Sequence, residues 1–225
     1  MLPETKTITF SGVNCYLITT DKGFVLIDTG YSKHRLDIEK ALESAGCMRE
    51  TLKLILLTHG DFDHSGNAAY LRKKYGIKIA MHNADKGMVE NGDLFYNRNA
   101  KFLLRIIGKV MLFFLRDSLK KTDRFTPDMY LEDGYDLSEI GIDAKIIYIP
   151  GHSKGSIGIL ASTGDLFCGD LLENTRKPAK NYLIDDKKAF GARIEKLNGL
   201  EIITIYPGHG EPFTMEQFIK TQNIV

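Results

Sequence analysis

Hydrophobic and polar positions in the first third of the chain predict a meander of strands followed by alternating helices and strands. Runs of β-type residues are separated by Ser-Gly and Asp-Lys-Gly turns, and a wholly apolar run near position 55 is typical of a strand buried on both faces. Apolar residues at helical spacing mark the intervening helices. We expect strands at residues 8–10, 13–19, 23–28, 54–57 and 77–81, and helices at 33–45 and 67–75.

The second half of the chain shows the same alternation of predicted strands and helices. We expect strands at residues 145–149, 156–160, 166–168 and 202–206, a helix at 187–197 and a final helix from 214. Short Asp-Lys-Gly and Thr-Gly-Asp turns imply antiparallel hairpins, which a purely parallel sheet lacks. Two packed sheets with helices outside therefore fit this order better than a continuous βαβ repeat, and we predict an α+β fold. The 225 residues are enough for one large core, so residues 1–225 are expected to form a single domain.

Residues 87–127 interrupt the pattern with a helical insertion. The stretch 102–115 is mostly apolar, but Arg105 and Lys109 lie inside it, so it lacks the ~18 uninterrupted apolar residues of a membrane span. On a helical wheel the basic residues gather on one side and leave a wide apolar face. These basic residues are Lys101, Arg105, Lys109, Arg116 and Lys120. The favoured interpretation is a cap over the active site; homodimerisation through 95–120 and contact with a lipid surface are the alternatives.

Composition limits the partners and the compartment. Lys+Arg 30 against Asp+Glu 29 gives a net charge of +1, which argues against nucleic acid as a partner. The start of the chain shows no secretory signal, so a cytoplasmic location is expected. The three cysteines form no CxxC motif. Cys15 and Cys168 lie in apolar strand-like runs, so we expect them to be core residues.

Metal-ligand residue types follow four of the predicted strands. Four of the six histidines come just after apolar strands, each beside Gly or Asp. Taken singly, each segment could be a helix cap or a tight turn, but together they indicate a site for divalent metal. The candidate ligands are His59, Asp61, Asp63, His64, His152, Asp170 and His209.

The motifs THGDFDHSGN, PGHSKGS, FCGD and YPGHG, in this order and spacing, resemble the ligand motifs of the metallo-β-lactamase superfamily. That resemblance implies a four-layer αββα sandwich of two mixed sheets and a metal-bound hydroxide as nucleophile. It assigns His59, position 61 and His152 to one metal ion. It assigns Asp63, His64 and His209 to a second, with Asp170 bridging. Asp63 would also act catalytically, by orienting the water and passing a proton to the leaving group.

The chain departs from this family at Asp61, where the usual residue is His. A carboxylate is a harder ligand and adds a negative charge, which favours iron or manganese more than the usual histidine does. Zinc remains the first expectation. Occupation of only one of the two metal sites is a real alternative.

Residues near the expected ligands suggest further roles. Asp28, in a strand-end Asp-Thr-Gly, is interpreted as the residue that orients a ligand histidine. The loop after Asp170 carries Arg176, Lys177 and Lys180, either as solvated side chains or as an anchor for a substrate carboxylate or phosphate. Asn181 and Tyr182 are candidates for an oxyanion contact.

Three functional classes remain open. The preferred one is a hydrolase of a small ester, thioester or lactone, with the apolar 95–120 segment as the candidate wall for an acyl chain. A glutathione-thioester hydrolase usually has a C-terminal helical extension, whereas this chain ends 16 residues after His209, which argues against that subclass. The alternatives are a diiron redox protein or sulfur dioxygenase, and a phosphodiesterase or nuclease.

Overall fold

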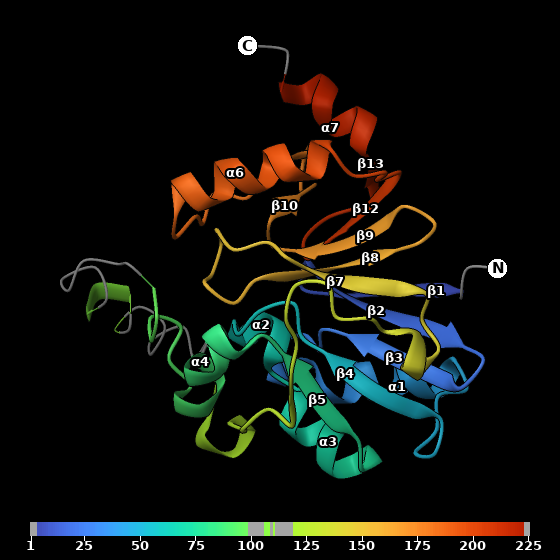
Figure 1. Ribbon diagram of the computed structural model, residues 1–225. Helices are drawn as coiled ribbons and strands as arrows, with labels where there is room; N and C mark the ends of the chain where they lie inside the picture. The colour runs from blue at the N-terminus through green and yellow to red at the C-terminus, as the bar shows by residue number, and fades with distance from the viewer. Residues whose placement is uncertain (1–3, 99–105, 109, 111–118, 223–225) are drawn as a thin grey trace.

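Two mixed β-sheets pack face to face, and each is covered on its outer face by helices (Figure 1). This computed structural model describes residues 4–98, 106–108, 110 and 119–222. The four layers confirm the predicted αββα sandwich. That the whole chain forms one domain stays a prediction.

The first sheet has the strand order β1-β2-β3-β4-β5-β6. The β1–β2 and β2–β3 pairs are antiparallel, and the β3–β4, β4–β5 and β5–β6 pairs are parallel. Its strands are β1 (Thr5–Phe10), β2 (Val13–Thr20), β3 (Gly23–Ile27), β4 (Leu52–Leu56), β5 (Lys78–Met81) and β6 (Met129–Tyr130).

The second sheet has the order β13-β12-β9-β8-β7, with β9 and β12 parallel and the other pairs antiparallel. Its strands are β7 (Ala144–Tyr148), β8 (Ile157–Ala161), β9 (Asp165–Gly169), β12 (Thr204–Pro207) and β13 (Phe213–Thr214). A separate antiparallel pair consists of β10 (Leu172–Glu173) and β11 (Ala179–Lys180).

The longer helices lie outside the sheets, α1 and α3 against the first and α6 and α7 against the second (Figure 1). The α-helices are α1 (Arg35–Ser44), α2 (Phe62–Ser65), α3 (Ala68–Tyr75), α4 (Lys86–Asn91), α6 (Lys187–Asn198) and α7 (Met215–Gln222). The 3-10 turns are η1 (Ser32–His34), η2 (Asn83–Asp85), η3 (Lys121–Asp123) and η4 (Ser138–Ile140).

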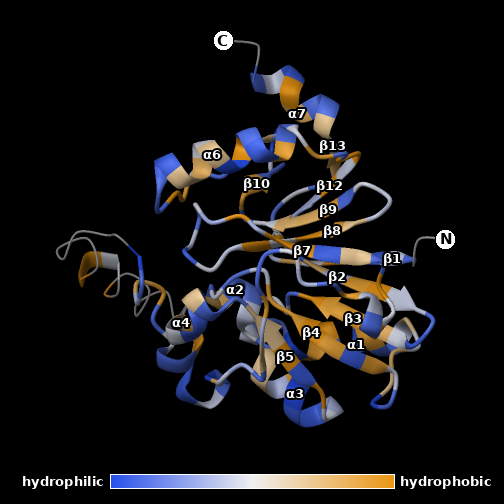
Figure 2. Ribbon diagram, viewed as in Figure 1, coloured by the Kyte–Doolittle hydropathy of each residue, from blue (hydrophilic) through white to orange (hydrophobic). Residues whose placement is uncertain are grey.

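Strand β4 shows why the apolar run near position 55 belongs to a sheet covered on both faces. Its side chains alternate, so Leu54 and Leu56 enter the core between the two sheets, while Ile55 and Leu57 pack toward α1 and α3. Figure 2 shows the central strands of the first sheet as hydrophobic. A strand with both faces buried ends in a rigid position, and the loop after β4 together with the following helix α2 carries four of the candidate ligands.

The predicted elements are present, with ends displaced by one to a few residues. The single-turn helix α2 and the short strands β6, β10, β11 and β13 were not predicted, because two to four residues are too few to show a period. In the 87–127 insertion, helix α4 ends at Asn91, and residues 106–108 are helical. Most of the predicted basic face (Lys101, Arg105, Lys109 and Arg116) lies outside the described residues. Within the described part of the chain, no helix is long and apolar enough to cross a membrane.

Candidate metal centre

The candidate ligands meet at one edge of the sandwich, where strands of both sheets end. His59 and Asp61 lie in the loop after β4, and Asp63 and His64 lie on α2. The second sheet supplies His152 after β7, Asp170 after β9 and His209 after β12. All seven predicted residues are therefore brought together from four segments that lie between positions 59 and 209.

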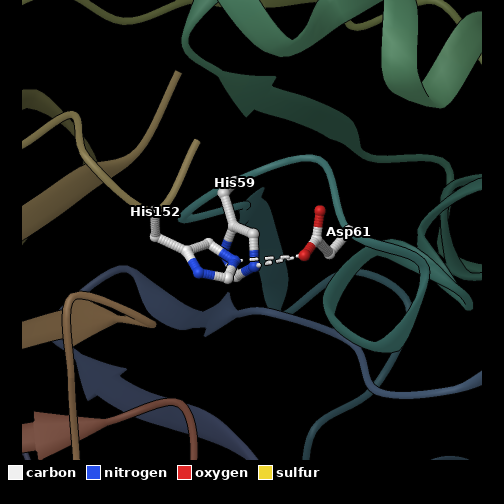
Figure 3. Close-up of side chains that lie close together, drawn as sticks. All are labelled: His59, Asp61 and His152. Carbon is white, nitrogen blue, oxygen red and sulfur yellow. Dashed lines mark hydrogen bonds and ion pairs between the residues drawn. The ribbon is translucent and has the colours of Figure 1, made fainter. Parts of the chain in front are cut away.

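The seven side chains fall into three overlapping groups, and within each group the possible ligand atoms lie within 4.8 Å of one another. These groups are His59/Asp61/His152, His59/His64/Asp170 and Asp63/His64/His209. In the first group, Asp61 Oδ2 is 3.1 Å from His152 Nε2 and 3.6 Å from His59 Nε2 (Figure 3). Asp170 lies between the groups, with an oxygen 3.3 Å from His209 Nε2 and 3.8 Å from His152 Nε2. This is the position that a bridging carboxylate requires.

Each ligand histidine is oriented by a hydrogen bond at Nδ1, which leaves Nε2 facing the centre. His59 Nδ1 lies 2.9 Å from Thr58 Oγ1, and His64 Nδ1 lies 2.9 Å from Asp28 Oδ2. Backbone carbonyls accept from the other two rings, Leu183 O at 2.7 Å from His152 Nδ1 and Gly12 O at 2.9 Å from His209 Nδ1. Such partners fix the tautomer that binds a metal through Nε2.

Several buried ligand atoms have no hydrogen-bond partner among the described residues. They are His59 Nε2, His64 Nε2 and Asp170 Oδ1, of which the last two lie 3.3 Å apart and pair with each other when His64 is protonated. Buried polar atoms are rarely left without a partner, because desolvation costs about 1–3 kcal/mol each. Their convergence with imidazole and carboxylate donors fits a divalent metal such as zinc, iron or manganese.

The electrostatics of the cluster reflect its three carboxylates. Burial would raise the pKa of Asp61, but Arg98 and the neighbouring histidines outweigh it and hold that pKa well below its usual range. Burial would likewise raise the pKa of Asp170, but His64 outweighs it, so this pKa is also lowered. The pKa of Asp63 is raised, mainly by burial. The pKa of His64 lies well above its usual value because the surrounding carboxylates outweigh burial.

Two glycines allow the backbone to approach the ligands closely. A Cβ atom on Gly208 would lie 2.2 Å from Asp170 Oδ1 and 2.7 Å from His64 Cε1. Gly169 has φ of +50°, and its Cβ atom would lie 2.6 Å from Thr58 Oγ1. The glycines that precede His209 and Asp170 are therefore required by space, and at Gly169 also by backbone conformation.

The hydrogen bond predicted between Asp28 and a candidate ligand histidine is present. Its carboxylate accepts hydrogen bonds from Thr58 N at 2.9 Å, Thr58 Oγ1 at 2.8 Å and His64 Nδ1 at 2.9 Å. It thus joins the end of β3 to the loop after β4 and to α2.

Asp85 is a buried residue that the sequence analysis missed. Its Oδ2 accepts from Gly60 N at 3.0 Å and Ser153 Oγ at 2.6 Å, and its Oδ1 accepts from Gly155 N at 2.8 Å and Asn97 Nδ2 at 3.1 Å. This one carboxylate therefore joins the two loops that carry His59 and His152 to the insertion.

Arg98, in the insertion, is the other residue that the sequence analysis missed. Its Nη2 lies 2.8 Å from both carboxylate oxygens of Asp61 and 3.1 Å from His152 Nε2. Only 9% of its side chain is exposed. A single arginine in a basic segment is ordinarily solvated, so no local pattern indicates this contact.

A cavity of about 430 Å³ opens on the metal centre. Its walls are largely apolar, and Asp61, Asp63, Asp170, Arg98 and His209 lie at its base or side. The apolar walls consist of Tyr31, Phe62, Leu94, Phe95, Tyr182 and Leu183. The insertion contributes Leu94, Phe95 and Gly108 to the cavity wall, while most of the 102–115 stretch lies outside the described residues, so the cap stays a prediction.

The other candidates for substrate contact divide into two sets. Asn181 and Tyr182 line the cavity, and the oxyanion role assigned to them stays a prediction. Arg176, Lys177 and Lys180 are exposed and are not among the residues that line the cavity. The structure thus favours solvated side chains for this basic loop.

The model of the metallo-beta-lactamase superfamily matches residues 8–209, and the chain belongs to this family of metallo-hydrolases. Hydroxyacylglutathione hydrolase GloC from Haemophilus influenzae is 30% identical over 212 residues, which cover 91% of this chain and 88% of that protein. The probable metallo-hydrolase YflN from Bacillus subtilis is 25% identical, over 94% of this chain and 85% of its own.

Solved structures agree with this assignment. TTHA1623, crystallised in a di-iron-bound form, has a TM-score of 0.74 and 25% identity, covering 99% of this chain and 100% of that one. The B3 metallo-beta-lactamase BLEG-1 has a TM-score of 0.75 and 23% identity, covering 96% and 97%. The chain therefore has the fold of this metallo-hydrolase family.

Proposed function

We propose that this protein hydrolyses the ester or thioester bond of a small substrate with an apolar acyl group. The observation that carries the proposal is the cavity of about 430 Å³, whose floor holds the ligand cluster and whose walls are aromatic and aliphatic. A cavity of this size accommodates a small molecule and excludes a folded polymer. The charge of +1 also gives no support to a nucleic-acid substrate.

The seven predicted ligands would hold one or two divalent ions, which in such sites activate a water molecule and polarise the scissile carbonyl. Asp63 is the ligand carboxylate best placed to carry a proton. It lines the cavity and is 16% exposed, against 7% for Asp61 and 6% for Asp170. We infer that it accepts the proton of the attacking water and returns it to the leaving group.

The comparison with GloC supports a thioester in particular. This chain covers 88% of a relative named for hydroxyacylglutathione hydrolysis. A glutathione thioester is therefore among the proposed substrates, contrary to the expectation based on the residues after His209. Lactones remain within the same proposal because they are cyclic esters.

The test is a substrate panel on the full chain loaded separately with zinc, iron or manganese. The panel contains a hydroxyacyl-glutathione thioester, acyl thioesters and esters of increasing length, a lactone, a β-lactam and a phosphodiester. We expect the highest kcat/KM for a thioester or ester, and a fall in kcat of about 100-fold or more for Asp63→Asn. Asp37→Asn, at an exposed carboxylate on α1, is the control and should leave kcat unchanged. A preference for the phosphodiester, or no hydrolysis with any metal, would refute the proposal.

A redox function is the second candidate, favoured by the di-iron-bound form of the TTHA1623 structure. Metal analysis of the natively purified protein distinguishes the two. Two irons with a visible absorption band, and no turnover of the panel, would support the redox alternative.

A further inference from the structure

The Arg98 guanidinium lies against the first ligand group as a metal cation would. A single nitrogen, Nη2, lies 2.8 Å from Asp61 Oδ1, 2.8 Å from Asp61 Oδ2 and 3.1 Å from His152 Nε2. Its partners are two of the three members of the group His59/Asp61/His152. Arginine has donors only and stays protonated, so at each contact Arg98 donates and the ligand atom accepts.

His152 can satisfy only one of two partners. Its Nδ1 lies 2.7 Å from the carbonyl oxygen of Leu183, which accepts hydrogen bonds only, so Nδ1 carries the proton. In the neutral ring, Nε2 is then left with one in-plane lone pair, whereas the protonated ring donates from Nε2 to Asp61 Oδ2, 3.1 Å away. That lone pair either accepts a hydrogen bond from Arg98 or coordinates a metal ion, and it cannot do both.

The second ligand region is free of this competition. His64 Nε2 and Asp170 Oδ1 are buried and lie 3.3 Å from each other, and neither has another hydrogen-bond partner among the residues that the structure describes. His209 Nε2 faces carboxylates, at 3.3 Å from Asp170 and 3.6 Å from Asp63. No arginine or lysine of the described residues is bonded to these atoms, so a metal ion displaces only protons there.

We propose that Arg98 competes with a metal ion for Asp61 and His152, so that the protein binds one metal tightly at Asp63/His64/Asp170/His209 and a second only when Arg98 withdraws. The replacement of the usual histidine by Asp61 makes this possible, because a carboxylate can form a salt bridge with a guanidinium. The inference concerns metal loading and holds whichever bond the protein hydrolyses.

Arg98 is held in place by its neighbour in the chain. Asn97 donates to Asp85 Oδ1 at 3.1 Å and also to the carbonyl of Ala84, which ties the segment to the turn before α4. Arg98 Nε, in contrast, is buried without a hydrogen-bond partner in the described part of the chain. Among the described residues, the hydrogen bonds that Arg98 breaks when it moves away are those to Asp61 and His152.

The size of the effect follows from the population of the open state. The apparent dissociation constant of the second metal equals its intrinsic value divided by the fraction of molecules in which Arg98 is withdrawn. If that fraction is about one tenth or less, the second metal binds at least about tenfold more weakly than the ligand set itself allows.

Calorimetric titration of Zn²⁺ into the chelator-stripped full chain tests the proposal. For the wild type we expect one tight equivalent and a second that is weaker. For Arg98→Met, an apolar side chain of similar length, the second equivalent should tighten at least about tenfold while the first stays the same. Arg176→Met is the matched control, because it removes a charge from an exposed loop, and it should change neither equivalent.

Three results would overturn the proposal. They are two equally tight equivalents in the wild type, an unchanged second equivalent in Arg98→Met, and an equal gain in Arg176→Met. If Arg98→Met does not fold, Asn97→Ala replaces it and should tighten the second equivalent by a smaller factor; no gain would count against the proposal.

A nitrogen NMR titration supplies a readout that depends on the lone pair itself. The Nε2 resonance of His64 should shift with the first equivalent of Zn²⁺. That of His152 should shift only with the second, because Arg98 must leave first. A shift of His152 Nε2 with the first equivalent would contradict the proposal.

Discussion

Asp28 adopts an unfavourable backbone conformation in order to orient a ligand. Its φ of +58° is one of two positive values at non-glycine positions among the described residues. Such conformations cost about 1 kcal/mol or more and persist where the surroundings require them. Here the carboxylate receives three hydrogen bonds, one of them from His64 Nδ1, and so fixes the ring that two ligand groups share.

We predict that Asp28→Asn weakens zinc binding by about 10–100-fold, because the amide no longer favours the Nδ1-protonated tautomer of His64 through a negative charge. Competition with a chromophoric chelator measures the affinity. Asp37→Asn is a close control, since Asp37 Oδ2 lies 2.9 Å from His34 Nδ1 in an otherwise similar pair outside the centre. Equal affinities of Asp28→Asn and wild type would contradict the prediction.

At the scale of elements, the ligand loops are fixed to one another by Asp85. This carboxylate ends η2 and accepts hydrogen bonds from the loop after β4, the loop after β7 and the insertion. It is fully buried. Loops that would otherwise move independently are therefore held at a common distance from the metal.

We predict that Asp85→Asn lowers the free energy of unfolding by about 2–4 kcal/mol, because an amide nitrogen would face backbone donors that the carboxylate now satisfies. Urea denaturation of the metal-free chain measures the loss. Asp128→Asn provides the comparison, since Asp128 also accepts from a backbone donor, Ile79 N at 2.9 Å, but its side chain is 34% exposed. A loss no larger than that of Asp128→Asn would refute the role given to Asp85.

Most of the fold and of the candidate site could be predicted from the sequence. The sandwich and all seven candidate ligands were predicted, because each ligand follows an apolar strand in a short motif that is visible locally. Asp85 and Arg98 were missed, because their roles exist only after the insertion folds back onto loops far away in the chain. Neither residue stands in a motif, and an isolated aspartate or arginine usually indicates a solvated surface.

At the scale of the whole molecule, protons and metal compete for the same side chains. Although burial opposes it, neighbouring carboxylates raise the pKa values of His64, His152 and His209 above the ordinary 6.5. A histidine whose pKa is higher in the folded state stabilises the fold fully below pH 6.5, and this stabilisation is lost as the pH rises through the folded value.

We therefore predict that the Tm of the metal-free chain falls as the pH rises from about 6 to about 8, while the increase in Tm caused by Zn²⁺ grows over the same range. Metal binds the neutral imidazole and displaces the proton, so its affinity rises with pH. Scanning calorimetry with chelator or with excess Zn²⁺ at three pH values measures both trends. A metal-free Tm that rises with pH would contradict the sign.

Each outer ligand group combines side chains from the two sheets: His59 and Asp61 with His152, and Asp63 and His64 with His209. Neither half of the chain contains a complete set, so a fragment of either half would lack a working centre. Activity consequently depends on the alignment of two separately built layers. A substitution far from the metal that shifts one sheet against the other would therefore change the distances between the ligands. The rate of turnover would then report how accurately the two sheets are aligned.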